Sequence, residues 1–328
     1  MRAARVRPVF AVLIACVGTV GVARAGTDAY GWLMKIDQAA RTRNFDGIFV
    51  YQHGDKLETM RIVHRVDNGR VMERLVSLNG VPREIIRTDR EVQCFLPDEN
   101  SVVVEHRKAE ANGFPSILPQ QLSELKNNYT IELGRSGRVA GRDSQLIVIR
   151  PKDGYRYGYE LWADKVTGLL LRADLVDMTG KAVEQFMFTQ IQPDAPIALA
   201  DLRPHFANKN SIWHRANDDD EIVSSSPGWA PAQLPAGFKL STRIMRKMPT
   251  RKQPVEHLVY SDGLAAVSIF VERLPARTEG AKPAVSAANH VGAVNAFVKV
   301  VDNHQITVVG EVPAATVNAI GESVKPLP

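Results

Sequence analysis

At 328 residues the chain has room for one large domain or two ordinary ones. Its formal net charge of +5 gives no support to nucleic-acid binding, because four of the basic residues lie in a leader that we expect to be removed. The two cysteines, Cys16 and Cys94, exclude a disulfide framework and a cysteine-based metal site, since Cys16 lies in the same leader.

Residues 1–25 are predicted to be a secretory signal peptide. A basic region precedes the apolar stretch 9–22, and Ala23-Arg24-Ala25 has the small-x-small pattern of a cleavage site. The apolar stretch is too short for a comfortable transmembrane helix. Without the leader the formal net charge falls to +1, because four basic residues are lost: Arg2, Arg5, Arg7 and Arg24. A lipoprotein signal that ends at Cys16 is the rival interpretation, but it would leave a very short apolar core, so we expect cleavage after Ala25.

The pattern of residues 26–206 predicts a helix followed by one large antiparallel sheet. The helix is expected at 28–43, where Asp28 can cap it and apolar residues recur near one face. Short strands at even spacing then favour a continuous sheet over βαβ units. They are expected at 47–53, 57–66, 70–78, 83–88, 91–96, 101–106, 129–134, 137–139 and 145–150. Asn79-Gly80 is the strongest signal in the chain for a two-residue hairpin turn.

The segment 155–188 predicts three more strands joined by two tight turns. The turns are expected at 164–168 and 177–180, and each ends in a glycine that can adopt a positive φ. Alternation with a period of two gives the first strand one apolar, aromatic face and one wetter face, on which Arg156 and Trp162 lie. The apolar face of the first two strands carries Tyr157, Tyr159, Leu161, Leu169, Leu171 and Leu175.

The polar segment 207–228 is predicted to be a linker to a second, smaller domain at 229–328. It contains the acidic run 218–221, which lacks the glycine and the alternating oxygen ligands of an EF-hand loop and is interpreted as solvated. In the second domain, strands are expected at 238–246, 255–260, 264–274, 293–301 and 305–310, and a closing helix at 313–324. The expected fold class is therefore α+β, with a large curled antiparallel sheet followed by a smaller α+β domain.

No pattern of catalytic or metal-binding residues is present in the sequence. GxSxG, SxxK, P-loop, GxGxxG and HExxH motifs are missing, and no two of the eight histidines lie four residues apart. We therefore expect no enzyme activity, no metal and no cofactor. Cys94 lies in a strand-like run and is interpreted as a small buried hydrophobic residue rather than a reactive thiol.

A single-layer sheet of about ten strands tends to curl, so its apolar face becomes a concavity. Two interpretations of that face stay open. Its side chains pack under the helices, or a gap between sheet and helices accepts acyl chains or an extended peptide, with 114–119 as its lid. The candidate groove residues are Phe114, Ile117, Leu118, Tyr157, Tyr159, Leu161, Leu169, Leu171 and Leu175.

Five segments of the chain closely resemble the RseB/MucB family. They are NFDGIFVYQHG (44–54), DGYRYGYELWADKVTGLLLRADLVDMTGKAVEQF (153–186), WAPAQLPAGF (229–238), VYSDGL (259–264) and TVVGEVP (307–313). The resemblance spans nearly all of the mature chain and keeps the order of the motifs. It implies a first domain similar to the LolA/LolB lipoprotein carriers, an unclosed half-barrel with helices across its mouth, and it implies no catalytic residues.

The same resemblance implies a periplasmic negative regulator of an envelope-stress sigma factor of the σE/AlgU type. Such a protein binds the periplasmic part of a membrane anti-sigma factor of the RseA/MucA type and shields it from the site-1 protease. Lipopolysaccharide or lipoprotein acyl chains then displace it. The expected partners are these two classes and no nucleic acid, and both a monomer and a homodimer stay open. The alternatives are a LolA-type lipoprotein or lipid carrier, which would need only the first domain, and a periplasmic hydrolase.

Overall fold

The computed structural model describes residues 25–106, 118, 122–206, 210–215, 221–223, 228–246, 253–274 and 289–327. Apart from its last residue, the predicted signal peptide lies outside these residues. None of the helices that they form has both the length and the hydropathy needed to cross a membrane.

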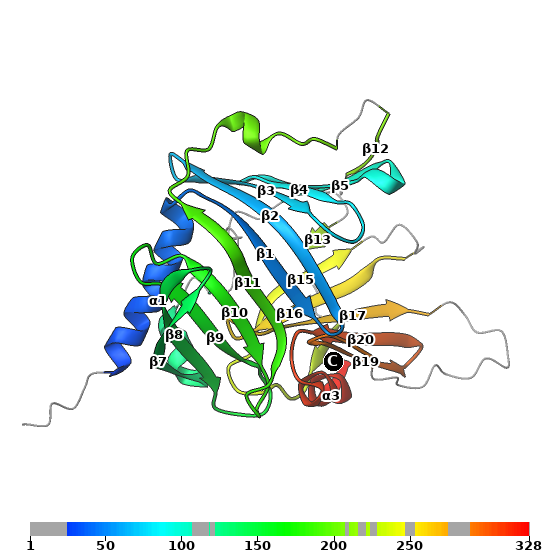
Figure 1. Cartoon of the computed structure of the whole chain (residues 1–328). Coiled ribbons are helices and arrows are strands. Elements are labelled where there is room, and N and C mark those ends of the chain that lie inside the picture. Colours follow the sequence, from blue (N-terminus) through cyan, green and yellow to red (C-terminus); the bar gives the residue numbers. More distant parts are fainter. Residues whose placement is uncertain are drawn as a thin grey trace, which may run out of the picture.

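A 12-stranded sheet forms the first domain, in the order β12-β6-β5-β4-β3-β2-β1-β11-β10-β9-β8-β7 (Figure 1). Its strands are β1(Phe45–His53), β2(Lys56–Asp67), β3(Arg70–Ser77), β4(Glu84–Arg87), β5(Glu91–Leu96), β6(Ser101–His106), β7(Tyr129–Val139), β8(Arg142–Pro151), β9(Gly158–Asp164), β10(Leu170–Val176), β11(Ala182–Pro193) and β12(Ile212–Arg215). All neighbours pair antiparallel except β12, which pairs parallel with β6. The sheet is curved and does not close on itself, so the predicted unclosed half-barrel is confirmed.

Helix α1(Ala25–Thr42) covers one end of this sheet and packs on β7 and β8 (Figure 1). It begins three residues before Asp28, the expected cap. Its buried residues recur every three or four positions, which places them on one face: Ala29, Leu33, Ile36 and Ala39. Two short elements, η2(Leu122–Glu124) and α2(Leu125–Asn128), lead into β7. The large hydrophobic core therefore lies between α1 and the β7 side of the sheet.

The predicted two-residue turn at Asn79-Gly80 is wrong, because β3 ends at Ser77 and β4 begins only at Glu84. The amide side chain of Asn79 explains the longer loop. It accepts a hydrogen bond from the backbone N–H of Thr59 and donates one to the carbonyl of Leu57, both on β2. These bonds hold Asn79 against the neighbouring strand instead of within a tight turn.

The turns of the 155–188 segment are confirmed, and its first strand begins later than expected. Gly168 and Gly180 both have positive φ, at 81° and 84°. Strand β9 begins at Gly158, so residues 155–157 precede it. The strands expected separately at 129–134 and 137–139 form the single strand β7, with a register shift between Leu133 and Ser136 on its pairing with β8.

The second domain is built on a seven-stranded sheet, β13-β15-β16-β17-β20-β19-β18. Its elements are β13(Glu221–Val223), β15(Lys239–Arg246), β16(Val255–Ser261), β17(Ala266–Arg273), β18(Asn289–Val291), β19(Val294–Val301), β20(His304–Gly310) and α3(Ala314–Ser323). A two-stranded sheet joins β14(Trp229–Pro231) to β21(Val324–Pro326). Val317 and Ile320 of α3 pack on the sheet and form its separate core with the apolar residues of β16, β17 and β20. The smaller α+β domain is thus confirmed.

The chain that leaves β11 crosses the convex face of the first sheet before it reaches the second domain. It contains η3(Leu199–Leu202), and Leu202 packs on Val63 of β2. The buried carboxylate of Glu84 accepts hydrogen bonds from the backbone N–H groups of His205 and Phe206. Strand β12 then extends the first sheet and β13 begins the second, so both strands fall within the segment predicted as a linker.

Candidate functional site

The concave face of the first sheet changes in character along its strands. Near α1, Leu171 of β10 and Phe188 of β11 are fully buried in the core. Two residues further along the same strands, Ala173 of β10 lies opposite Phe186 of β11. On its other side, Phe186 lies opposite Tyr51 of β1. Here the helix no longer covers the sheet. These side chains are the apolar floor of a cavity, as the alternation of side chains between two faces requires.

This cavity has a volume of about 630 Å³ and lies between the two domains. Most of its wall comes from the concave sheet face, and Leu264 and Glu311 of the second domain also line it. Its apolar lining residues are Phe49, Met60, Leu75, Tyr159, Ala173, Leu175, Phe186 and Leu264. A cavity of this size and lining is suited to an acyl chain or to the apolar side chains of a peptide.

Charged groups surround the mouth of the cavity, and most of them are paired with one another. Arg83 forms an ion pair with Glu58, and Arg87 lies 2.9 Å from Glu73, which also contacts the buried ring of His64 at 2.8 Å. These ion pairs provide carboxylate partners for Arg83 and Arg87, two cations close to the sheet. A ligand in the cavity would therefore meet a polar rim whose charges are already largely compensated.

The predicted groove residues fall into four groups. Tyr159 and Leu175 line the cavity, and the hydroxyl of Tyr157 accepts a hydrogen bond from the side chain of Asn295. The others that the structure describes are buried in the core of the first domain: Leu118, Leu161, Leu169 and Leu171. Phe114 and Ile117 lie outside the described residues, and so does most of the predicted lid. The role of Tyr159 and Leu175 as a ligand wall stays a prediction.

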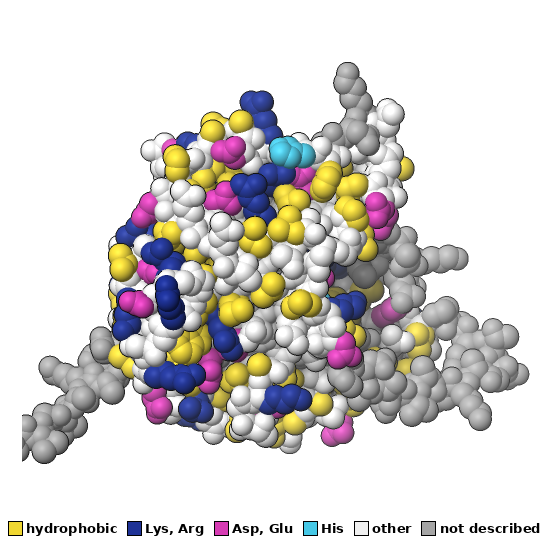
Figure 2. All heavy atoms as spheres, viewed as in Figure 1, with side chains coloured by type: hydrophobic (Ala, Val, Ile, Leu, Met, Phe, Trp, Pro, Cys, Tyr) yellow, Lys and Arg dark blue, Asp and Glu magenta, His cyan; other side chains and the backbone are white. Residues whose placement is uncertain are grey.

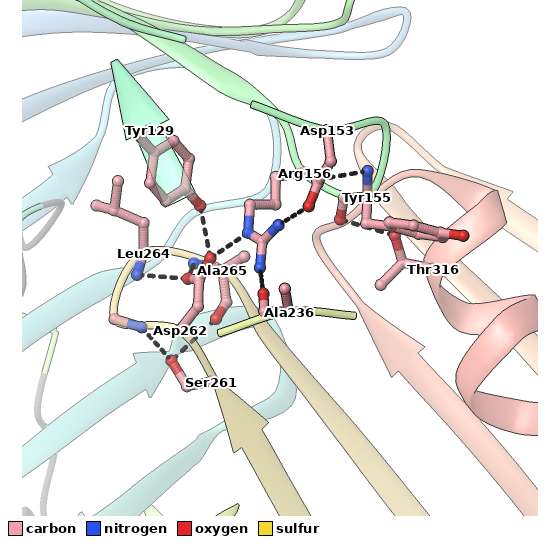
Figure 3. Close-up of polar contacts among 11 residues, drawn as sticks. Tyr129, Asp153, Tyr155, Arg156, Ala236, Ser261, Asp262, Leu264, Ala265 and Thr316 are labelled. Atoms are coloured by element: carbon pink, nitrogen blue, oxygen red, sulfur yellow. Dashed lines mark hydrogen bonds and ion pairs between the residues drawn. The ribbon is translucent and has the colours of Figure 1, made fainter. Parts of the chain in front are cut away.

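A buried arginine joins the two domains next to this cavity (Figure 3). The guanidinium group of Arg156, just before β9, donates hydrogen bonds to Asp153, to Asp262 and to the backbone carbonyl of Ala236. Asp262 lies in the turn between β16 and β17, and it also accepts a hydrogen bond of 2.9 Å from the Tyr129 hydroxyl. Both side chains of the Arg156–Asp262 pair are 0% exposed. A charge that is buried this completely requires such a set of partners.

The turn that holds Asp262 is shaped by the same carboxylate. Its other oxygen accepts hydrogen bonds from the backbone N–H groups of Leu264 and Ala265, at 3.0 and 2.8 Å. Leu264 is thereby held at the cavity wall (Figure 3). On the far side of Arg156, the Thr316 hydroxyl of α3 donates to the carbonyl of Tyr155. The second domain is therefore held on both sides of the short segment that precedes β9.

The prediction that Arg156 and Trp162 lie on a wetter face is wrong. Arg156 is buried because the second domain packs over it, and Trp162 is 7% exposed. The ring of Trp162 is covered by Gly137, where an added Cβ would lie 2.4 Å from it, and by the guanidinium group of Arg135 at 5.8 Å. Alternation within one strand contains no information about packing from distant segments. The interdomain contact of Arg156 was missed for that reason.

A second interdomain contact lies at the rim of the cavity. Glu184 of β11 accepts a hydrogen bond from the Tyr51 hydroxyl at 2.5 Å and one from the backbone N–H of Ala293 at 3.2 Å. Glu311, which follows β20, lines the same cavity as Glu184, close enough for their two carboxyl groups to interact. The pKa of Glu311 is raised to about 7, first by loss of water around the carboxyl and then by the negative charge and the hydrogen bond of Glu184.

Models of two protein families match the chain in the order of its two domains. The MucB/RseB N-terminal domain matches residues 28–206, and the MucB/RseB C-terminal domain matches residues 223–325. The chain belongs to the MucB/RseB family. A curated relative, the sigma factor AlgU regulatory protein MucB of Pseudomonas aeruginosa, is 34% identical over 93% of this chain and 93% of the relative.

Solved structures of the MucB/RseB family match the chain over both domains. The complex of Pseudomonas aeruginosa MucA and MucB has a TM-score of 0.72 at 32% identity, covering 92% of this chain and 99% of that one. A crystal structure described as that of MucB has a TM-score of 0.61 at the same 32% identity, covering 92% and 98%. The sequence identity and the coverage are nearly equal for these two structures. The difference between their TM-scores therefore reflects how each chain is arranged in three dimensions. The present arrangement is more similar to the one in the MucA complex.

Proposed function

We propose that the protein is a periplasmic negative regulator of an envelope-stress sigma factor. It binds the periplasmic region of a membrane anti-sigma factor of the MucA type, protects that region from site-1 proteolysis, and releases it when lipopolysaccharide or lipoprotein acyl chains bind. Membership of the MucB/RseB family supports the regulatory role, and the name of the AlgU-regulating relative agrees with it. The observation that carries the proposal is the higher similarity to the MucA-bound arrangement.

The apolar cavity supports the lipid-sensing part of the proposal. Its floor is the aromatic and aliphatic face of the sheet, and its remaining wall comes from Leu264 and Glu311 of the second domain. A ligand in the cavity would thus contact both domains and favour one relative arrangement of them over another. A carrier would need only the first domain, so a cavity that both domains line favours the regulator over a carrier.

Binding of a MucA-type periplasmic segment to residues 26–328 tests this function directly. We expect a stable complex by isothermal titration calorimetry, and we expect lipid A to weaken it at least tenfold, since a ligand that prefers one of two states shifts the equilibrium by its differential affinity. A complex that is indifferent to lipid A would remove the sensing role. Failure to form any complex would refute the regulator itself.

A further inference from the structure

The face drawn in Figure 2 carries basic and acidic side chains interspersed among hydrophobic ones. At the contact between the domains, a carboxyl group of one domain faces a carboxyl group of the other. Glu184 belongs to the first domain and Glu311 to the second, and both line the cavity. Two carboxyl groups in contact can share a proton, whereas two carboxylates repel each other.

We propose that the present arrangement, in which the two domains are in contact and which we call closed, is coupled to protonation of the Glu184–Glu311 pair. The domains then separate into an open arrangement as the pH rises through neutrality. The geometry carries this proposal, since the pair lies across the domain contact at the rim of the cavity. Glu184 is also held to the second domain by the backbone N–H of Ala293, so a repulsive charge at Glu311 acts on the same contact.

Two tyrosine hydroxyl groups face the pair, one from β1 and one from β9. From β1 the Tyr51 hydroxyl donates to Glu184, and its pKa is raised by burial, by this hydrogen bond, and by the charges of Glu184, Glu311 and Glu58. From β9, Tyr159 has its pKa raised by burial and then by the charges of Glu311, Asp262 and Glu184.

Three basic residues lie near Glu184. His53 is opposite it on β1, and Lys56 and Lys181 line a neighbouring cavity with it that Glu311 does not line. The pKa of Tyr157 is raised first by burial, and the negative charges of Asp177, Glu311 and Glu184 raise it further. His53 lies 3.8 Å from Glu58, which is paired with Arg83, and Arg87 is paired with Glu73. Arg83 and Arg87, which line the same cavity as the pair, therefore have carboxylate partners of their own.

The direction of the effect follows from the pKa of Glu311. The closed arrangement raises this pKa from its ordinary value of 4.5 to about 7, so it binds a proton that the open arrangement has lost. Closure therefore carries no penalty below about pH 4, a growing penalty between the two pKa values, and a constant one above about pH 8. Between pH 6 and pH 8 the ratio of closed to open molecules is expected to fall by up to about tenfold. Glu311 as a whole residue is exposed to solvent, which screens its charge. The fall of about tenfold is therefore an upper limit.

Single-molecule energy transfer on the mature chain without a partner tests the coupling. Dyes on Glu105→Cys of β6 and Arg273→Cys of β17, in a Cys94→Ser background, report the distance between the domains. We expect the closed population to decrease from pH 6 to pH 8. Glu311→Gln, which cannot ionise, should keep it constant, and Glu132→Gln on the exposed face of β7 should titrate as the unmodified chain does.

A closed population that does not change with pH, or the same titration in Glu311→Gln, would overturn the proposal. The coupling bears on regulation only if the proposed function holds, because the closed arrangement is the one similar to the MucA complex. The two claims fail separately. A pH-dependent closure in the absence of any partner supports the coupling even if no anti-sigma factor binds.

Discussion

Asp262→Ala is expected to destabilise the protein or its domain contact by about 3 kcal/mol or more, because it leaves a buried arginine without its main carboxylate. Arg156 and Asp262 are both fully buried, and Tyr129 loses its hydrogen-bond acceptor in the same variant. If the domains stay together, the loss appears in the free energy of unfolding in urea. If they separate so that Arg156 becomes hydrated, the loss appears as a larger radius of gyration in small-angle X-ray scattering.

Glu124→Ala is a matched control, since Glu124 forms an ion pair of 3.3 Å with Lys239 across the same two domains. These side chains are 51% and 75% exposed, and a pair so accessible to water contributes at most about 1 kcal/mol. We expect the control to change neither measurement by more than that. Equal effects of Asp262→Ala and Glu124→Ala would contradict the assignment of Arg156 as the main interdomain contact.

Ala173→Trp is expected to weaken the binding of an acyl-chain probe by roughly a hundredfold. Ala173 lies on the cavity floor, and an indole there would occupy the space of about four methylene groups, each of which contributes about 0.8 kcal/mol when buried. Displacement of a fluorescent fatty acid measures the affinity. Far-ultraviolet circular dichroism and the unfolding midpoint establish that the variant folds, since a larger side chain in a packed region costs about 1–3 kcal/mol.

Ala200→Trp is the control for this effect, because Ala200 is exposed on η3 and does not line the cavity. It should bind the probe as the unmodified chain does. A second cavity variant, Leu175→Trp, guards against an effect that is specific to one site. Unchanged affinity in two folded cavity variants would show that acyl chains bind elsewhere or not at all.

The sheet and its turns could be predicted because their causes are local. Alternation of side chains indicates a strand, and turn residues that end in Gly168 or Gly180 indicate a positive φ, whatever lies far along the chain. The Asn79-Gly80 turn failed where a side chain bonded to a third strand, β2. Local patterns therefore predicted the elements well, and errors arose where a distant segment supplied the decisive partner.

The site was less accessible to sequence reasoning for the same physical reason. Arg156 and Asp262 are 106 residues apart, and Glu184 and Glu311 come from different domains, so no spacing or motif relates them. The apolar face was predicted, but which part of it would be covered by α1 was not. Coverage leaves Tyr159 and Leu175 at the cavity and buries Leu161 and Leu171 in the core. An arginine flanked by the tyrosines of 155–159 was the one signal that could have suggested a buried ion pair.

Cleavage of a MucA-type periplasmic segment by its site-1 protease tests the central claim most directly. The cleavage rate is measured for the segment alone, for the segment with a saturating concentration of the chain 26–328, and for the segment with that chain and lipid A. We predict that the chain slows cleavage at least tenfold, because a bound segment is protected from the protease, and that lipid A restores the rate. An unchanged cleavage rate in the presence of saturating chain would contradict the proposed regulatory role.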